Sequence, residues 1–282
     1  EASPQSYSFV PQTKSVQAAL SVLDHLGKSG SRDDYMLILQ EGWLQALLNA
    51  SAISQPCNTL PRISLFQFVF GLLTTLVNDE LANQLLRNSF RQCHALRTML
   101  IPRMILDEPH WKAVAQILES ADHICCLDMT FVGMSNYAVQ ASIIDVIQKP
   151  TLSSITSLSI DAGSNTQEFL NMLANSLANN SQLTQLQLIS TTLSEAVCRT
   201  FTQSLAQNHT LTSLSFARSF FDQSTIIDLF DAICRSQVLW NLDLEGWCLN
   251  KEHFFKLSEL LIDRRLQLHI LKLDYVTFSF TN

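Results

Sequence analysis

Charged residues are scarce in this chain of 282 residues, since Asp, Glu, Lys and Arg make up 15% of it, against roughly 25% in an average soluble domain. The balance is acidic, with 25 Asp and Glu against 18 Lys and Arg and a net charge of −7. Binding to a phosphate backbone needs a basic surface. The composition therefore argues against nucleic acid as a partner.

Glycine and long apolar runs are also lacking. The chain has seven glycines in all, and none of them forms the closely spaced group with which a loop surrounds a phosphate. The longest apolar stretch, residues 66–77, is interrupted by Gln67, Thr74 and Thr75, whereas a membrane-spanning helix needs about 20 apolar residues. The sequence predicts neither a glycine-rich phosphate loop nor a membrane span.

Cysteine is present in an odd number, seven, without regular spacing. This predicts free thiols and a reducing, intracellular (cytoplasmic) location instead of a disulfide framework. The candidate metal ligands are His123, Cys125 and Cys126, with Cys93 and His94 further upstream. Successive side chains of a strand point to opposite faces, so Cys125 and Cys126 are expected to diverge. No metal site and no cofactor are predicted.

A repeat is the feature that the sequence does have. Residues 176–188 and 204–216 are near copies, and each ends in the pattern Leu-x-x-Leu-x-Leu or its Phe variant. This alternation predicts a short strand with one buried face, and self-similarity at a fixed period indicates stacked repeats. The seven strand cores are expected near 96–101, 124–129, 155–160, 183–188, 211–216, 239–244 and 268–273, and a weaker candidate lies at 65–70.

Between these frames, apolar residues recur with the spacing of a helix. One such stripe consists of Phe169, Leu170, Leu173 and Leu177, as expected for a helix that buries one side. Strand and helix therefore alternate, which predicts an α/β fold over residues 96–282. Asn180 and Asn208 each precede a strand frame by three positions, and we expect them to end helices in the left-handed conformation that Asn tolerates.

These units resemble leucine-rich repeats of the ribonuclease-inhibitor type, which are about 28 residues long. The resemblance implies a solenoid with a curved parallel sheet on its concave side, helices on its convex side, and a macromolecule bound along the concave face. Divergent repeats of this sort are also similar to those of bacterial effectors, which implies secretion into a host cytosol and action on a host protein.

One departure from the family concerns the position three residues beyond the last strand leucine. The family places Asn or Cys there, and its side chain bonds the neighbouring repeat. Of the residues at this position here, only Thr191 and Ser219 could make a comparable bond. Either the ladder is largely absent, or the frame is displaced by one residue in the outer repeats. The full set is Met104, Val132, Gly163, Thr191, Ser219, Trp247 and Val276.

Residues 1–95 read as a helical N-terminal region. Apolar stripes predict helices over 16–26 and 36–48, with Asp33 or Asp34 as the cap of the second, and either a helix or a strand over 63–77. We expect this region to cap the hydrophobic end of the first repeat, and a separate helical module is the alternative. The last frame lacks the helix that would complete its repeat, so a longer parent protein is expected.

No convincing catalytic set is present, and a non-enzymatic protein is predicted. Cys126 and Asp128 match the Cys-x-Asp of bacterial leucine-rich-repeat ubiquitin ligases, where that motif belongs to a separate helical domain. Arg218 beside a strand is a candidate arginine finger, but no supporting polar group accompanies it in the sequence. The alternatives left open are the substrate-recognition part of a larger enzyme, such as a ubiquitin ligase, and an autoinhibitory sensor.

The positions between and after the strand leucines are expected to contact the partner. Carboxylates gather at both ends of this face, and Asp243 and Glu245 lie close enough in sequence to repel each other. Aromatic rings beside carboxylates suit a protein partner with a basic patch, although Trp240 and Trp247 would also suit packing between repeats. The predicted contact residues are Asp128, Asp161, Gln187, Trp240, Asp243, Glu245, Lys272, Asp274 and Tyr275.

Overall fold

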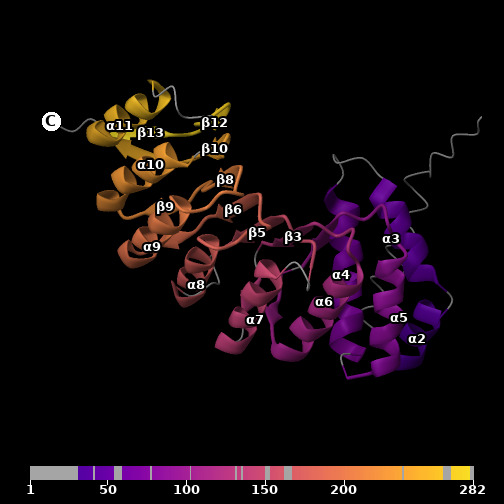
Figure 1. The fold of residues 1–282 in the computed structure, drawn as a ribbon. Helices are drawn as coiled ribbons and strands as arrows, with labels where there is room; N and C mark the ends of the chain where they lie inside the picture. The colour runs from indigo at the N-terminus through magenta and orange to yellow at the C-terminus, as the bar shows by residue number, and fades with distance from the viewer. Residues whose placement is uncertain are drawn as a thin grey trace, which may run out of the picture. The chain divides into compact units, whose positions relative to one another are not determined.

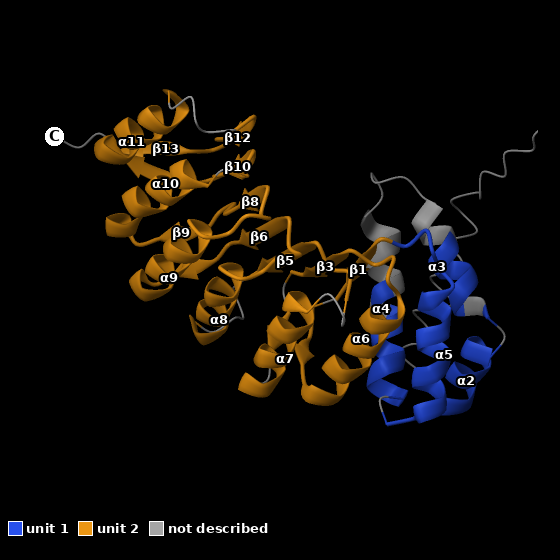
Figure 2. Ribbon diagram, viewed as in Figure 1, with its two compact units in different colours: residues 1–96 blue, residues 97–282 orange. Residues whose placement is uncertain are grey.

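The structure, a computed structural model, divides into two compact units, residues 1–96 and residues 97–282 (Figure 2). It describes residues 31–279 apart from 41, 54–58, 77, 102, 131, 135, 150–152, 162–166, 237 and 263–267. In that part of the chain, no helix combines the length and the apolarity that crossing a membrane requires. The stripe expected at 16–26 lies outside the described residues.

Unit 1 is helical wherever it is described. Its helices are α2 (Arg32–Gln40), α3 (Trp43–Ile53), α4 (Thr59–Leu76) and α5 (Glu80–Arg91). The segment left open between helix and strand lies in α4, so the strand candidate at 65–70 was wrong. The core includes Tyr35 of α2, Leu72 of α4, and Leu86 and Phe90 of α5, all buried.

Short polar contacts fix where these helices begin. Ser31 caps α2, because Asp34 N–H donates to Ser31 Oγ at 3.3 Å while Ser31 N–H donates to Asp34 Oδ2 at 2.9 Å. The expected cap at Asp33 or Asp34 was therefore misplaced by two or three residues. Asp79 caps α5 by accepting from Ala82 N–H at 3.1 Å. Both caps satisfy N–H groups that have no partner within their own helix.

Unit 2 contains a parallel sheet of seven strands that lie side by side in the order of the chain. This confirms the predicted α/β class with a parallel sheet. The middle leucine of each frame pairs with that of the next, so that Leu158, Leu186 and Leu214 lie in one row. The strands are β1 (Thr98–Leu100), β3 (Cys126–Met129), β5 (Ser157–Asp161), β6 (Gln185–Ile189), β8 (Ser213–Ser215), β10 (Asn241–Asp243) and β12 (Ile270–Lys272).

One helix follows each of the first six strands of this sheet. Figure 1 shows α7 to α11 on one side of the strands, where the strand leucines are buried. The helices are α6 (Glu108–Ser120), α7 (Tyr137–Gln148), α8 (Gln167–Leu177), α9 (Glu195–Leu205), α10 (Ile226–Arg235) and α11 (Lys251–Ile262), with the 3-10 turn η2 (Gln223–Thr225) before α10.

Short second strands follow the main strands in several repeats and form two-stranded pairs. The pairs are β2 with β4, β7 with β9, and β11 with β13. Their bounds are β2 (Ile105–Leu106), β4 (Gly133–Met134), β7 (Thr192–Leu193), β9 (Phe220–Phe221), β11 (Cys248–Asn250) and β13 (Thr277–Ser279).

Six of the seven main strands, β3 to β12, begin with the same arrangement, which we call the strand-start bulge: one carbonyl of the preceding repeat accepts from two successive N–H groups. Thr156 O accepts from Thr184 N–H at 2.8 Å and from Gln185 N–H at 3.0 Å. Thr184 O accepts in the same way from Thr212 at 2.8 Å and Ser213 at 3.0 Å. The two residues that share one carbonyl are those between the first and the middle apolar residue of the frame, so their side chains do not follow simple alternation.

Asn180 and Asn208 join neighbouring repeats. Asn208 is buried, and its Nδ2 donates to Leu177 O at 2.7 Å and to Asn180 O at 3.3 Å in the preceding repeat. Its Oδ1 accepts from the N–H groups of Thr210 at 3.0 Å and Leu211 at 2.7 Å. Neither Asn has a positive φ, so the prediction of a left-handed helix end was wrong.

A second row of bonds crosses the repeats after the main strands. Ser219 Oγ donates to Leu188 O at 2.8 Å, and Trp247 Nε1 donates to Phe216 O at 2.9 Å, each in the preceding repeat. Thr191 Oγ1 instead bonds within its own repeat, to Ile189 O at 3.2 Å. The expected pair of Thr191 and Ser219 is thus corrected to Ser219 and Trp247, because an indole N–H reaches the same carbonyl position as a hydroxyl.

A residue with a left-handed backbone stands one position before each of four residues of this row, Thr191, Ser219, Trp247 and Val276. Ser190, Arg218, Gly246 and Tyr275 have φ values of 51°, 55°, 77° and 57°. Ser190 N–H donates to Ala217 O at 3.0 Å, and Gly246 N–H donates to Asp274 O at 2.9 Å, so the turn continues the bonds between repeats. A residue with a Cβ pays roughly 1–2 kcal/mol for this conformation, and glycine does not.

Opposite changes at two of these positions are expected to shift stability in opposite directions. Ser190→Gly should raise the free energy of unfolding by about 1 kcal/mol, because the exposed serine carries the strain of φ 51°. Gly246→Ala should lower it by about 1–2 kcal/mol, since a Cβ there would lie 3.4 Å from Arg218 Cγ and 3.5 Å from its Cα. Denaturant titration measures both, and shifts of the same sign would contradict the explanation.

His253 ties α11 to the preceding repeat in its neutral form. The side chain is 1% exposed. Its Nε2 lies 3.0 Å from Gln223 O and acts as the donor, while Nδ1 accepts from Asn250 N–H at 3.3 Å. A proton on Nδ1 would oppose that N–H. Burial lowers the pKa of His253 below its ordinary 6.5, against smaller opposing contributions from Gln223 and Glu252.

This lowered pKa predicts acid sensitivity. Between the two pKa values the unfolded chain binds more protons than the folded one, so stability rises with pH. The contribution of His253 should be complete above about pH 6.5 and lost as the pH falls below it. His253→Gln should flatten the fall of Tm between about pH 8 and pH 5, whereas His209→Gln, at an exposed position, should not. Equal slopes for wild type and His253→Gln would contradict the assignment.

Candidate functional site

The strand side chains that face away from the helices form a surface that we call the open face. Its uncharged Ser and Gln side chains occupy β5, β6 and β8, while carboxylates stand on β3 and β10. Among the described helices of unit 2, none lies on this side in Figure 1. The residues are Cys126, Asp128, Ser157, Ser159, Gln185, Gln187, Ser213, Ser215, Asn241, Asp243, Ile270 and Lys272.

Charged side chains of opposite sign pair at the β10 end of this face. The Nε and Nη2 atoms of Arg218 donate to Glu245 Oε1 at 3.0 and 2.8 Å. Asp243 Oδ2 accepts from Ser215 Oγ at 3.2 Å and lies 3.9 Å from Lys272 Nζ. The hydrogen bond and the charge of Glu245 raise the pKa of Arg218. The expected repulsion between Asp243 and Glu245 is therefore offset, because each carboxylate has its own cation.

Two aromatic rings beside these charges are exposed and a third is buried. Trp240 is 41% exposed and Tyr275 is 84% exposed, whereas Trp247 is 3% exposed and packs between repeats. The backbone of Trp240 is fixed, since its carbonyl accepts from His269 N–H at 2.8 Å and Ile270 N–H at 3.0 Å. Asp274, also exposed, accepts from Gly246 N–H through its carbonyl. These side chains belong to two adjacent repeats.

The remaining predicted contact residues lie apart from this group. Asp128 is on β3, four strand spacings from β10, or about 19 Å, and its Oδ1 accepts from Thr130 N–H at 3.0 Å. Asp161 is 5% exposed, which leaves little of it for a partner. Gln187 is exposed and accepts from Ser159 Oγ at 3.1 Å. The structure thus brings together Trp240, Asp243, Glu245, Lys272, Asp274 and Tyr275.

Arg218 belongs to the same group but was not among the predicted contact residues. It stands two positions beyond the last apolar residue of its frame and 27 residues before Glu245, so the repeat spacing was the available signal. Its residue type does not predict the left-handed backbone, since arginine rarely adopts a positive φ. In the sequence, no polar residue was found to support Arg218 as an arginine finger. In the structure, the carboxylate of Glu245 bonds its guanidinium.

The cysteines of β3 depart from expectation. Cys125 Sγ and Cys126 Sγ lie 3.9 Å apart, so the prediction of opposite faces was wrong. The strand-start bulge explains this, because the N–H groups of both residues donate to Arg97 O at 2.9 and 3.0 Å. Within the described ranges, no group of three or more His, Cys, Asp or Glu side chains is placed to hold a metal ion.

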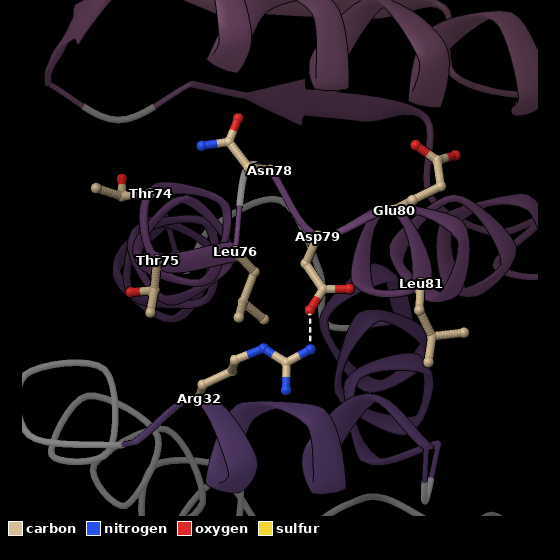
Figure 3. A pocket seen from close by; sticks show the side chains of 8 residues that line it. All are labelled: Arg32, Thr74, Thr75, Leu76, Asn78, Asp79, Glu80 and Leu81. Atoms are coloured by element: carbon tan, nitrogen blue, oxygen red, sulfur yellow. Dashed lines mark hydrogen bonds and ion pairs between the residues drawn. The ribbon is translucent and has the colours of Figure 1, made fainter.

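Unit 1 has an open pocket of about 540 Å³ between α2 and the α4–α5 junction (Figure 3). Asp79 lies at its centre, bonded to the Arg32 guanidinium and to Ala82 N–H. These bonds, that of Ala82 first, lower the pKa of Asp79. Arg32 and Asp79 neutralise each other, and Glu80, the third charged residue of the lining, lies 3.1 Å from Arg87 Nη2. Its lining is Arg32, Thr74, Thr75, Leu76, Asn78, Asp79, Glu80 and Leu81.

Comparison with known proteins assigns no family. No protein-family profile matches the sequence, and no curated protein matches it. Among solved structures, the chain is similar to an internalin (inlF) from Listeria monocytogenes, with 14% identity, coverage of 78% of this chain and 72% of that chain, and a TM-score of 0.40. At this TM-score the likeness supports neither a shared fold nor a shared function.

Proposed function

We propose that residues 97–282 form a leucine-rich-repeat solenoid of the ribonuclease-inhibitor type that binds a protein partner on the open face, without catalysis of its own. The observation that carries the proposal is the open face itself. It spans six strands, β3 to β12, most of its side chains are polar, and exposed Trp240 and Tyr275 stand at one end. Exposed aromatic residues are enriched where proteins bind proteins.

The partner surface should carry a modest positive charge. Asp243, Glu245 and Asp274 contribute three negative charges to this end of the face, and Arg218 and Lys272 contribute two positive ones. The net charge of this end of the face is therefore negative, and it would attract a basic patch weakly because the two cations offset most of the negative charge. Charges arranged in this way contribute more to orientation and association rate than to affinity.

Further parts of the proposal concern setting and unit 1. The helices of unit 1 would cover the hydrophobic end of the first repeat, because solenoids need capped ends. An intracellular setting fits the free thiols of the six described cysteines. We include in the proposal that the protein is a bacterial effector that engages a host protein, on the resemblance of its divergent repeats alone.

One observation argues against the ubiquitin-ligase alternative, whose candidate nucleophile is Cys126. Burial, with the neighbouring Cys125 as a second cause, raises the pKa of Cys126. A nucleophilic cysteine reacts as the thiolate, which a raised pKa disfavours. An enzyme part elsewhere in a longer protein remains compatible with the open face as its substrate-binding surface.

Isosteric neutralisation tests the site. Asp243→Asn combined with Glu245→Gln and Tyr275→Ala should lower affinity for the partner at least about tenfold, because it removes two carboxylates and an exposed ring. Replacement of the carboxylates by lysine is avoided, because a lysine side chain there would lie next to Arg218 or Lys272 and repel it. The measurement is affinity purification from host-type cell lysate with quantitative mass spectrometry, followed by calorimetric titration of the recovered protein.

The matched control is Asp145→Asn, an exposed carboxylate on α7 on the helical side of the sheet. It should leave binding unchanged. Thermal unfolding of the triple variant should stay within a few degrees of wild type, since Asn and Gln keep the shape of the half-buried Asp243 and Glu245 and Tyr275 is exposed. Recovery of the same protein in the same yield by the triple variant would rule out this end of the open face.

A further inference from the structure

Hydrogen bonds hold the backbone around the two sulfur atoms at the start of β3, which lie 3.9 Å apart. Cys125 and Cys126 donate both of their N–H groups to Arg97 O, and Cys125 O accepts from Thr156 N–H at 2.8 Å, Ser157 N–H at 3.0 Å and Thr156 Oγ1 at 3.4 Å. Five hydrogen bonds to two neighbouring repeats therefore fix this dipeptide. Its side chains can adjust only through their own rotation.

This rigidity opposes a disulfide between the two residues. The sulfur atoms are 3.9 Å apart, whereas a disulfide requires about 2.05 Å. Consecutive cysteines can close that gap only if the peptide between them turns, and turning would break the bonds to Arg97 O and from Thr156. The folded chain consequently favours two separate thiols.

A metal ion placed between the sulfurs needs no such movement. With a metal–sulfur bond of about 2.3 Å, two sulfurs 3.9 Å apart subtend about 116° at the metal. Rotation of the two side chains, with the backbone unmoved, opens this angle toward the near-linear geometry that a two-coordinate Cu(I) bis-thiolate prefers. Zinc at a protein site takes four ligands, and the described residues supply no third His, Cys, Asp or Glu here. A soft ion that accepts few thiolate ligands fits the pair better, and Cu(I) is the soft ion that thiolates select.

We propose that Cys125 and Cys126 form a dithiol site that binds one Cu(I) ion. Both residues are half-buried, so the ion would have access from solvent while the bulge keeps the backbone in place. Binding exchanges two thiol protons for the metal: Cu⁺ and two thiols give a bis-thiolate complex of charge −1 and two released protons. No electron is transferred. The site is independent of the protein-binding proposal.

The surroundings of the pair suit a bound complex of this charge. Arg97 donates from Nη1 to His123 O at 3.3 Å, which places a guanidinium beside the same turn. Because binding releases two protons, affinity should fall as the pH is lowered.

The test is a competition titration of the reduced full chain with Cu(I) under anaerobic conditions, against a chromophoric Cu(I) chelator. Wild type should retain one Cu(I), and Cys125→Ser and Cys126→Ser should each weaken retention at least about tenfold. The controls Cys248→Ser, Cys234→Ser and Cys57→Ser should retain it. Retention by Cys126→Ser at the wild-type level, or no retention by wild type, would overturn the proposal.

Oxidised glutathione provides a second measurement, with mass spectrometry of the intact chain. A mixed disulfide with glutathione, or no reaction, supports the rigid dithiol. Loss of two hydrogen atoms at Cys125 and Cys126 with an unchanged Tm would show that the backbone does not hold the sulfurs apart, and would overturn it. Circular dichroism of each serine variant establishes that it is folded, and addition of Cu(I) should raise the Tm of wild type and of the three controls but not that of Cys125→Ser or Cys126→Ser.

Discussion

Trp247→Ala should lower the free energy of unfolding by about 3–5 kcal/mol. The indole is 3% exposed, and its ring centroid lies 4.7 Å from that of Phe221 and 6.0 Å from that of Phe216. Truncation would leave a cavity among these rings and would also remove the donor of Phe216 O. Denaturant titration of the purified chain measures the loss.

Trp240 in the same repeat is the matched control. It is 41% exposed, so Trp240→Ala should cost less than about 1 kcal/mol. Trp247→Phe separates the two causes, since it keeps most of the ring and loses the N–H, for an expected cost of about 1–3 kcal/mol. Equal losses for the two alanine variants would mean that Trp247 does not pack between the repeats as described.

Asn208→Ala should cost about 2–4 kcal/mol, because one buried side chain serves two repeats. Its amide bonds Leu177 O and Asn180 O on one side and the N–H groups of Thr210 and Leu211 on the other. Without it, these buried groups lose their partners, and such a loss carries the full desolvation cost of each group. The same titration applies, with hydrogen exchange at Leu211 as a local measurement.

Two further variants make this prediction specific. Asn179→Ala, at an exposed position in the turn after α8, should change stability by less than about 0.5 kcal/mol. Asn208→Asp keeps the acceptor oxygen but turns a second oxygen toward Leu177 O, so it should destabilise at neutral pH and recover partly when the carboxyl is protonated. A cost at Asn179 equal to that at Asn208 would refute the bridging role.

The strand frames were predictable because burial imposes a simple alternation. Leu158, Leu186, Leu214 and Leu242 are all buried and stand in one register across the sheet. A slip of one residue would have turned each of them to the open face. Repetition of the frame then predicted parallel strands joined by helices, because a parallel pair needs a crossover connection.

The bonds between repeats were not predictable from residue type alone. Asn208 and Trp247 both act through carbonyls of the preceding repeat, and which side chain reaches such a carbonyl depends on distances of a few tenths of an ångström. The left-handed turn at Arg218 likewise follows from the bond between its N–H and Glu245 O, at 2.6 Å. Sequence periodicity specifies the position of a residue but not its hydrogen bonds.

The candidate contact residues were predicted with mixed outcomes for a related reason. Their placement on or after the strands followed from alternation, but their pairing did not. Arg218 neutralises Glu245, and Asp161 is buried. Cys125 and Cys126 meet because two N–H groups share Arg97 O, and a bulge of this kind leaves no trace in the spacing of apolar residues.

The strand-start bulge also bears on how such a chain evolves. Threonine occupies the same place in three successive repeats, as Thr156, Thr184 and Thr212. In each case its N–H donates to the preceding repeat, and its carbonyl accepts from two N–H groups of the next repeat. A cassette that runs from one of these threonines to the next can be duplicated or deleted whole, because the new junction restores the bonds that the old one made. The seven identities among the 13 aligned positions of residues 176–188 and 204–216 are what a duplication of one such cassette would leave behind.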